Sequence, residues 1–189
     1  MPRYLPVQLD AANEDIRTVY QQVESQLGMV PNLVKTLAHS PNFLQPVAEL
    51  YGQLLGETGL SERLRQLVIL KTCKLDKCKQ TVLLYSKKAQ EAGWTDQQIE
   101  AMDDLAATDL FTYYEKEVLR LTELVIREPD DIQNDFWTQL DNHFTSDQIV
   151  ELVVLIAFFS AINRVLLTLE VEADPEFQPE LQEAAQTSP

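Results

Sequence analysis

The chain is a succession of segments whose apolar residues recur at three- and four-residue spacing, which is the period of an α-helix. Several of these segments start at a residue that caps helices well, such as Asn13, Ser61 or Thr95. Only five of the 189 residues are glycine, and we find no convincing alternation of apolar and polar residues of the kind that marks a half-buried strand. The sequence therefore predicts an all-α protein.

The cap residues and breaks allow the helices to be placed along the chain. We expect helices over residues 13–28, 32–38, 40–56, 61–76, 77–93, 95–105, 108–127, 132–142 and 145–169. Asp76 is expected to be the N-cap of the fifth helix, which would put Cys78 in its first turn. We expect one domain over residues 1–171 and an acidic, flexible tail over residues 172–189.

Charge and composition exclude several classes of function. The formal net charge of −15 argues against nonspecific binding to nucleic acid and against docking on anionic membranes. Two cysteines in a chain of this length do not form a disulfide scaffold. The first residues hold no apolar signal-peptide core, so we expect a cytoplasmic protein.

One apolar segment, residues 149–169, resembles a membrane span in composition. A spanning helix needs roughly 20 mostly apolar residues, and here Glu151, Asn163 and Arg164 interrupt the run. We therefore interpret this segment as a central buried helix. Asn163 and Arg164 would then need polar partners, either at a subunit contact or beside a cavity near Gln66 and Tyr85.

The segment from Leu60 to Gly93 holds both cysteines and a basic cluster. Between Arg63 and Lys88 the chain has eight basic residues and a single acid, Asp76. The basic residues are Arg63, Arg65, Lys71, Lys74, Lys77, Lys79, Lys87 and Lys88. We interpret the lysines as a solvated face or as a contact with an acidic neighbouring subunit, with binding of an anionic ligand as the alternative.

Cys78 is the strongest candidate for chemistry in this segment. A helix N-terminus and the neighbouring Lys77 and Lys79 both favour the thiolate, whereas burial opposes it. The alternative is an inert, partly buried thiol. We do not expect a disulfide with Cys73, because residues five apart on an unbroken helix point ~140° away from each other.

The segment LSERLRQLVILKTCKLDKCKQTVLLYSKKAQEAGWTDQQIEAM resembles the core of the carboxymuconolactone decarboxylase and alkylhydroperoxidase D-like (AhpD-like) superfamily. The flanking segments Gly28–Gln45, Tyr113–Val125 and Phe144–Val165 resemble parts of its longer, peroxidase-related members. The resemblance covers Met29 to Asp174. It implies an AhpD-like helical bundle built around the helix pair at Cys78, assembled as a homo-oligomer.

The resemblance also implies a redox site, and this chain departs from that site at most positions. Family members reduce peroxides with a Cys-x-x-Cys pair, assisted by a preceding Glu and a following His. Here Cys78 matches the first cysteine, while Thr81, Tyr85 and Gln66 replace the second cysteine, the His and the Glu. Threonine cannot form a disulfide, glutamine does not titrate, and tyrosine, with an ordinary pKa of ~10, is a poor base at neutral pH.

The remaining candidate residues favour structural roles. His39 is expected at a helix end and His143 on an exposed turn, and two separated histidines do not predict a metal site. We expect no metal and no cofactor. Glu115 and Glu117 match a charged helix start of the family, and we expect them on the surface or at an interface.

Three functional hypotheses follow from these residues. The first is a peroxiredoxin-like, antioxidant thiol peroxidase with reduced activity resting on Cys78, which would take a peroxide or a small hydrophobic ligand. The second is a non-catalytic binding or assembly module of the same fold. The third is a cofactor-free lyase acting on a small organic acid. The replaced site residues favour the second hypothesis on chemical grounds, and the lysines around Cys78 favour the first.

Overall fold

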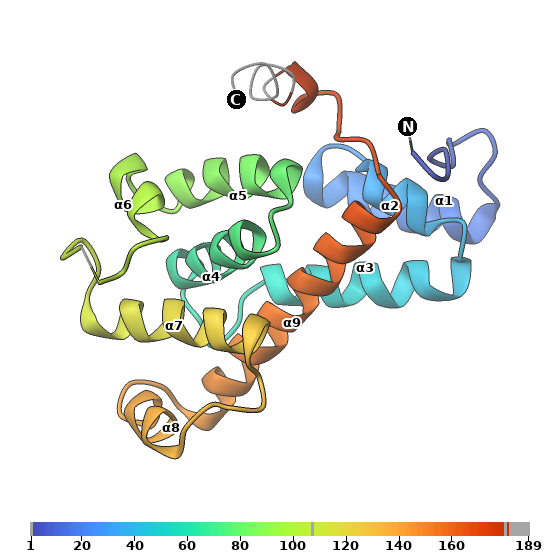
Figure 1. Ribbon diagram of the computed structural model, residues 1–189. Helices are drawn as coiled ribbons and strands as arrows, with labels where there is room; N and C mark the ends of the chain where they lie inside the picture. The colour runs from blue at the N-terminus through green and yellow to red at the C-terminus, as the bar shows by residue number, and fades with distance from the viewer. Residues whose placement is uncertain (1, 107, 180, 182–189) are drawn as a thin grey trace. The chain divides into compact units, whose positions relative to one another are not determined.

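The computed structural model describes residues 2–106, 108–179 and 181, and within them it shows nine α-helices and no strand. The all-α prediction is confirmed. The helices are α1 (Glu14–Leu27), α2 (Asn32–Leu37), α3 (Pro41–Leu55), α4 (Glu62–Leu75), α5 (Lys79–Glu91), α6 (Asp96–Ala101), α7 (Tyr113–Arg127), α8 (Asn134–Asp141) and α9 (Ser146–Thr168) (Figure 1).

The chain divides into two compact units. One is formed by the residues up to Gly56 together with those from Val165 onward, and the other is Glu57–Arg164. Each unit is described by itself below. The boundary between them falls inside α9, so this helix contributes to both units.

The first unit is built on α3, against which α1 and α2 pack. Helix α1 begins where predicted, because the Asn13 side chain accepts a hydrogen bond of 2.9 Å from the Ile16 amide. It ends at Gly28, whose φ of 75° suits a residue without a side chain. The buried core of the first unit consists of Ala12, Ile16, Val19, Tyr20, Val23, Ala38 and Leu44.

Part of the predicted C-terminal tail makes defined contacts in the first unit. Asp174 accepts a hydrogen bond of 2.7 Å from the amide of Asn32, and the Phe177 side chain is buried. Residues 180 and 182–189 of the predicted tail lie outside the described residues.

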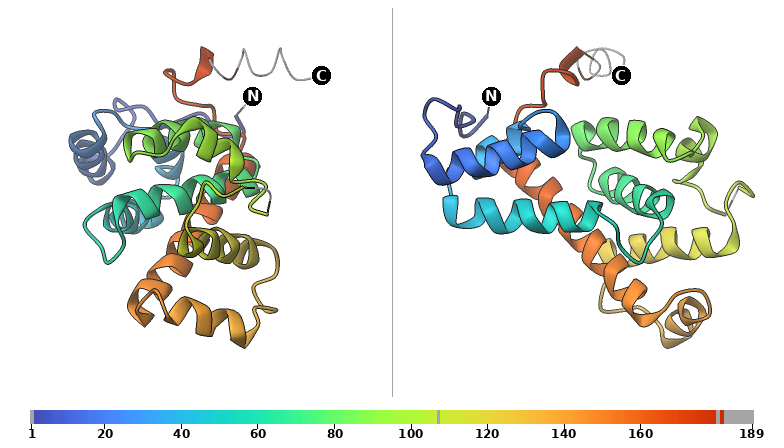
Figure 2. Two further views of the ribbon diagram at one scale, coloured as in Figure 1. Left: turned by 90° about the vertical axis from the view of Figure 1, so that its left-hand side faces the viewer. Right: turned by 180° about the vertical axis from the view of Figure 1, so that it is seen from behind.

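The second unit is organised around α4, which lies between α5 and α7 and packs against both (Figures 1 and 2). Leu67, Val68, Ile69 and Leu70 are four consecutive residues of α4, so they point to every side of the helix, and all four are fully buried. A helix that is apolar all round is buried on all sides. This central helix, the turn after it and the helix that follows carry the four candidate site residues.

Helix α7 begins later than predicted. The expected start was Thr108 or Asp109, whereas α7 starts at Tyr113 after the N-cap Thr112. Glu115 makes a capping box there, because its side chain accepts a hydrogen bond of 2.8 Å from the Thr112 amide. A threonine followed three residues later by a glutamate was therefore the correct start signal.

Helix α9 is long and apolar enough to cross a membrane by length and composition alone, and half of its most apolar window is buried within the protein. Leu152, Leu155, Ile156 and Phe159 are buried on one side of it, as in the core helix of a globular protein. The central-helix interpretation accounts for these residues.

Candidate functional site

The turn between α4 and α5 carries both cysteines. Helix α4 ends at Leu75 with Asp76 as its C-cap, and Lys77 follows with a positive φ of 58°. Cys78 is then the N-cap of α5. The prediction placed Cys78 in the first turn of this helix, whereas the residue precedes that turn. The Cys78 amide donates a hydrogen bond of 3.2 Å to the carbonyl oxygen of Cys73.

Both cysteines are free thiols, and both are completely shielded from solvent. The Cys73 Sγ lies 3.9 Å from Oδ1 of Asn163, to which it can donate a hydrogen bond. Burial raises the pKa of the Cys73 thiol to about 12, against the opposite effect of its side-chain hydrogen bonds with Thr81 and Asn163. At neutral pH Cys73 is therefore a thiol and not a thiolate.

Thr81 stands where the family has its second cysteine, and its hydroxyl is used inside the protein. Its Oγ1 lies 2.8 Å from Asn163 Oδ1 and 3.0 Å from the carbonyl oxygen of Cys78. The hydroxyl has one proton to donate, and both acceptors are within hydrogen-bond distance of it. Thr81 therefore positions the first turn of α5 against Asn163.

Asn163 connects this threonine to a buried carboxylate. Its Nδ2 donates a hydrogen bond of 3.0 Å to Asp76, which also accepts one of 3.1 Å from the hydroxyl of Ser160. Arg164 lies 3.6 Å from the same carboxylate and contacts Ser160. We name Asp76, Thr81, Ser160, Asn163 and Arg164 the Asp76 network.

The Asp76 network corrects the role predicted for Asp76. The residue does not cap α5 with its side chain, because the carboxylate is committed to Ser160 and Asn163 on α9. The network also provides the polar partners that Asn163 and Arg164 of α9 were expected to need. Asn163 is completely buried and fully engaged, whereas Arg164 keeps 60% of its side chain exposed. Ser160 was missed from the sequence, since a serine on an apolar helix carries no distinctive signal.

The other two candidate residues, Tyr85 and Gln66, are buried as well. The Tyr85 ring packs edge-on against Phe159, with ring centroids 5.3 Å apart. Oε1 of Gln66 has no hydrogen-bond partner among the described residues. Thus α5 places Thr81 and Tyr85 on one face toward α9, as their spacing predicts, and Gln66 contributes a buried acceptor from α4.

The basic cluster is not a uniform solvated face. Lys71 is 1% exposed, and its Nζ pairs with Glu123 at 2.6 Å and donates a hydrogen bond of 2.7 Å to the carbonyl oxygen of Met102. Lys74 pairs with Asp103 at 2.8 Å and donates to the carbonyl oxygen of Ile99. These two lysines join α4 to its neighbours, which corrects the prediction for them. Lys77, Lys79 and Lys87 are exposed.

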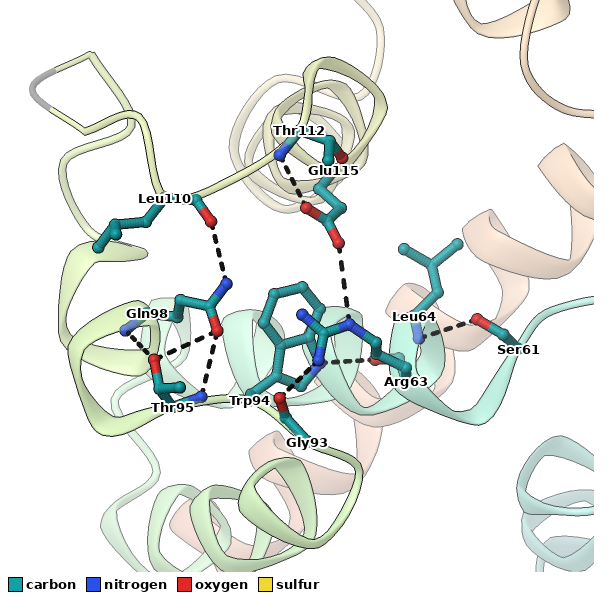
Figure 3. Close-up of polar contacts among 10 residues, drawn as sticks. All are labelled: Ser61, Arg63, Leu64, Gly93, Trp94, Thr95, Gln98, Leu110, Thr112 and Glu115. Atoms are coloured by element: carbon teal, nitrogen blue, oxygen red, sulfur yellow. Dashed lines mark hydrogen bonds and ion pairs between the residues drawn. The ribbon is translucent and has the colours of Figure 1, made fainter.

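Arg63 joins α4 to the chain beyond α5 (Figure 3). Its guanidinium stacks over the Trp94 ring, 3.6 Å from the ring centroid, and donates a hydrogen bond of 2.6 Å to the carbonyl oxygen of Gly93. The Trp94 Nε1 in turn donates to the carbonyl oxygen of Arg63 at 2.8 Å. Nε of Arg63 lies 3.9 Å from the Glu115 carboxylate. This contact therefore secures the start of α7 against α4.

Glu115 and Glu117 are both buried within the chain, so the prediction that they lie on the surface or at an interface is wrong. Glu115 is buried because its carboxylate caps α7 and faces Arg63. Oε2 of Glu117 has no hydrogen-bond partner among the described residues.

The two histidines lie apart from the thiols in the chain. His39 follows α2, and its Nε2 is 2.9 Å from the carbonyl oxygen of Leu5. His143 is exposed beside Tyr113. In the described part of the chain, no group of three His, Cys, Asp or Glu side chains is arranged to hold a metal ion.

Part of the chain matches a known protein family. Residues 41–124 match the model of the carboxymuconolactone decarboxylase family, and this range holds Gln66, Cys78, Thr81 and Tyr85. This match and the fold together support a relationship to the carboxymuconolactone decarboxylase and AhpD-like superfamily. A curated relative, the uncharacterized protein YdfG of Bacillus subtilis (strain 168), is 20% identical over 114 residues, which are 60% of this chain and 78% of YdfG.

Solved structures of AhpD-like proteins share the fold of this chain. An uncharacterized peroxidase-related protein of Ralstonia eutropha JMP134, with an alkylhydroperoxidase AhpD core, superposes with a TM-score of 0.80 at 22% identity, covering 93% of this chain and 94% of that one. The debrominase Bmp8, solved alone and with 2,3,4-tribromopyrrole, gives a TM-score of 0.75 at 16% identity, covering 95% of this chain. The AhpD-like fold prediction is confirmed.

Proposed function

We propose that this protein, related to the carboxymuconolactone decarboxylase family, reduces hydroperoxides slowly through the thiol of Cys78. The observation that carries the proposal is the place of this thiol at the N-cap of α5, the position that the family resemblance assigns to the first redox cysteine. Backbone N–H groups at a helix N-terminus stabilise a thiolate and the negative charge that develops on sulfur during attack on oxygen.

The chemical step needs only one sulfur. The Cys78 sulfur attacks the terminal oxygen of the hydroperoxide, the O–O bond breaks, and the products are a cysteine sulfenic acid and an alcohol or water. The sulfur is oxidised and the peroxide is reduced. A thiol reductant then returns Cys78 to its starting state.

Two features make the proposed reaction slow. Cys78 is completely buried, so the peroxide reaches it only when the α4–α5 turn opens. Thr81 and Gln66, which replace the second sulfur and the acid of the family site, offer neither a disulfide partner nor a titrating group.

The second candidate is a non-catalytic assembly module, and the commitment of the site residues to internal contacts favours it. Thr81 is held by Asn163, and Tyr85 by packing on Phe159. The debrominase with the same fold supports the wider point that this architecture hosts other chemistries. We further propose that the protein acts in the cytoplasm as a homo-oligomer.

Reaction of the reduced protein with cumene hydroperoxide, followed by intact mass spectrometry, tests the proposal. With dimedone present during the reaction, we expect the sulfenic acid of Cys78 to be trapped as a dimedone adduct, and no adduct in Cys78→Ser. A native protein whose Cys78 stays unmodified, while the urea-unfolded chain reacts, would exclude the peroxidase function and favour the assembly module.

A further inference from the structure

The turn that joins α4 to α5 is a Schellman motif, and the two cysteines occupy its two key positions. The Cys78 amide donates to the carbonyl oxygen of Cys73 at 3.2 Å, and the Lys77 amide donates to that of Lys74 at 3.1 Å. Together with the positive φ of Lys77, these are the two hydrogen bonds that define the motif. Cys73 is its third-last helical residue and Cys78 is the second residue beyond the cap.

Side chains at these two positions of a Schellman motif commonly contact each other. The expectation that Cys73 and Cys78 point apart assumed an unbroken helix, and the left-handed residue Lys77 removes that assumption. With standard bond lengths, the 3.2 Å hydrogen bond holds the two Cα atoms within about 7 Å of each other. Disulfides need a Cα separation of ~4.4–6.8 Å.

The electrostatics of Cys73 agree with this proximity. A negative charge on Cys78 is among the influences that raise the pKa of Cys73, so the two thiols are close enough to interact. Neither sulfur has another cysteine available, since the chain has only these two.

We propose that Cys73 is the resolving partner of Cys78, and that the two form a reversible intramolecular disulfide across the α4–α5 turn. Formation of this disulfide by a peroxide rests on the proposed function of Cys78. The pair takes over the task of the family's second cysteine, which is Thr81 here. Cys73 lies five residues before Cys78, whereas the second cysteine of the family pair lies three residues after the first.

The chemistry balances without any further component. The Cys78 sulfenic acid is attacked by the Cys73 sulfur, the S–O bond breaks, and water leaves with the Cys73 proton. In sum, two thiols and one hydroperoxide give one disulfide, one alcohol and one water. With a small disulfide as oxidant, two thiols of the protein are exchanged for two thiols of the reagent.

The experiment treats the full-length reduced protein with two oxidants separately, cumene hydroperoxide and oxidised glutathione. Each sample is quenched, unfolded in urea, alkylated with N-ethylmaleimide and weighed by intact mass spectrometry. We expect a monomer that has lost two hydrogen atoms and takes up no N-ethylmaleimide, and that takes up two after reduction with dithiothreitol. Peptide mapping should place the bond between Cys73 and Cys78.

Four variants make the result specific to the turn. Cys73→Ala and Cys78→Ala should each abolish the internal disulfide, and circular dichroism checks that both are folded. Lys77→Gly keeps the left-handed turn and should form the disulfide as fast as the parent. Lys77→Val disfavours that turn and should form the disulfide about tenfold more slowly.

The two oxidants separate this inference from the proposed function. A disulfide that forms with glutathione but not with the hydroperoxide would uphold the pair and reject the peroxidase function. Sulfenylation of Cys78 by the hydroperoxide, with no internal disulfide under either oxidant, would uphold the function and overturn the pair. A disulfide between two molecules, with none inside one chain, would also overturn it.

Discussion

Asn163 on α9 donates a hydrogen bond of 3.0 Å to the carboxylate of Asp76 at the end of α4. Together with the hydrogen bond from Ser160 to the same carboxylate, it fixes the register of α9 against the end of α4. The same asparagine accepts from Thr81, so the turn that carries both cysteines is held from two sides. This residue therefore couples the stability of the second unit to the geometry of the thiols.

Asn163→Ala should destabilise the protein strongly. The change leaves Asp76 and the Thr81 hydroxyl without their partner in a buried site, and each such loss costs ~1–3 kcal/mol. We expect the free energy of unfolding to fall by about 3 kcal/mol in urea titrations. Arg164→Ala is the matched control, because Arg164 is the exposed member of the Asp76 network and should cost less than ~1 kcal/mol. Equal losses in the two variants would contradict the role given to Asn163.

The ion pair between Lys71 and Glu123 should respond unequally to the loss of each partner. Glu123→Gln leaves a charged lysine that is 1% exposed, and we expect a loss of about 3 kcal/mol. Lys71→Met removes the buried charge and leaves Glu123, 31% exposed, able to regain water, so the loss should be about 1–2 kcal/mol. Urea unfolding measures both values. Lys79→Met, at an exposed site of the same basic cluster, should change stability little.

Gly93→Ala tests the contact drawn in Figure 3. Gly93 has a φ of 90°, which costs ~1–2 kcal/mol for a residue with a side chain. The added Cβ would also lie 3.3 Å from Nη1 of Arg63 and press on the cation that stacks over Trp94.

A double-mutant cycle separates these two costs of Gly93→Ala. In the Arg63→Ala background only the backbone strain remains, so Gly93→Ala should be less destabilising there, by roughly 0.5–1 kcal/mol. Additive effects of the two substitutions would show that the Cβ contact is relieved without cost.

The raised pKa of Cys73 predicts how stability depends on pH in alkali. The thiol titrates near its ordinary value of 9.0 in the unfolded chain and at about 12 in the folded protein. Below pH 9 both the folded and the unfolded chain hold the Cys73 proton, so the contribution of Cys73 to stability is complete. Above pH 9 the unfolded chain releases the proton first, so stability is lost as the pH rises toward 12.

Cys73→Ala removes this contribution and provides the comparison. Between about pH 9 and 10.5 the parent protein should lose roughly 1.5 kcal/mol more stability than the variant. Urea titrations at three pH values in this range measure the difference. Parallel pH profiles of the two proteins would mean that Cys73 titrates normally in the folded state.

The helices were predictable where their signals are local. Asn13, Ser61 and Thr95 begin helices because each side chain accepts a hydrogen bond from a backbone amide three residues ahead. Such a contact is complete within one turn and needs no information from elsewhere in the chain. The start of α7 was misplaced because Thr108, Asp109 and Thr112 all resemble caps, and only Thr112 is followed by a glutamate that completes the box.

The candidate site was predictable only in part, for the same physical reason. The family resemblance identified Cys78, Thr81, Tyr85 and Gln66, and all four are buried in the second unit. The contact of Thr81 with Asn163 could not be inferred from the residues next to Thr81, because Asn163 lies 82 residues further along the chain.

By itself the sequence determined the all-α fold, the positions of most helices and the substitution of the family's redox residues. The tertiary structure decided how the charged and polar side chains are used. Lys71 and Glu115 read as surface residues from their charge, and they are buried because Glu123 and Arg63 compensate that charge. Lys77 is one of several lysines in the basic cluster, and nothing in the sequence marks it as left-handed. Its positive φ brings Cys73 and Cys78 to the two ends of one turn. A buried charge is compensated by partners that are distant in the chain, and only the folded protein selects them.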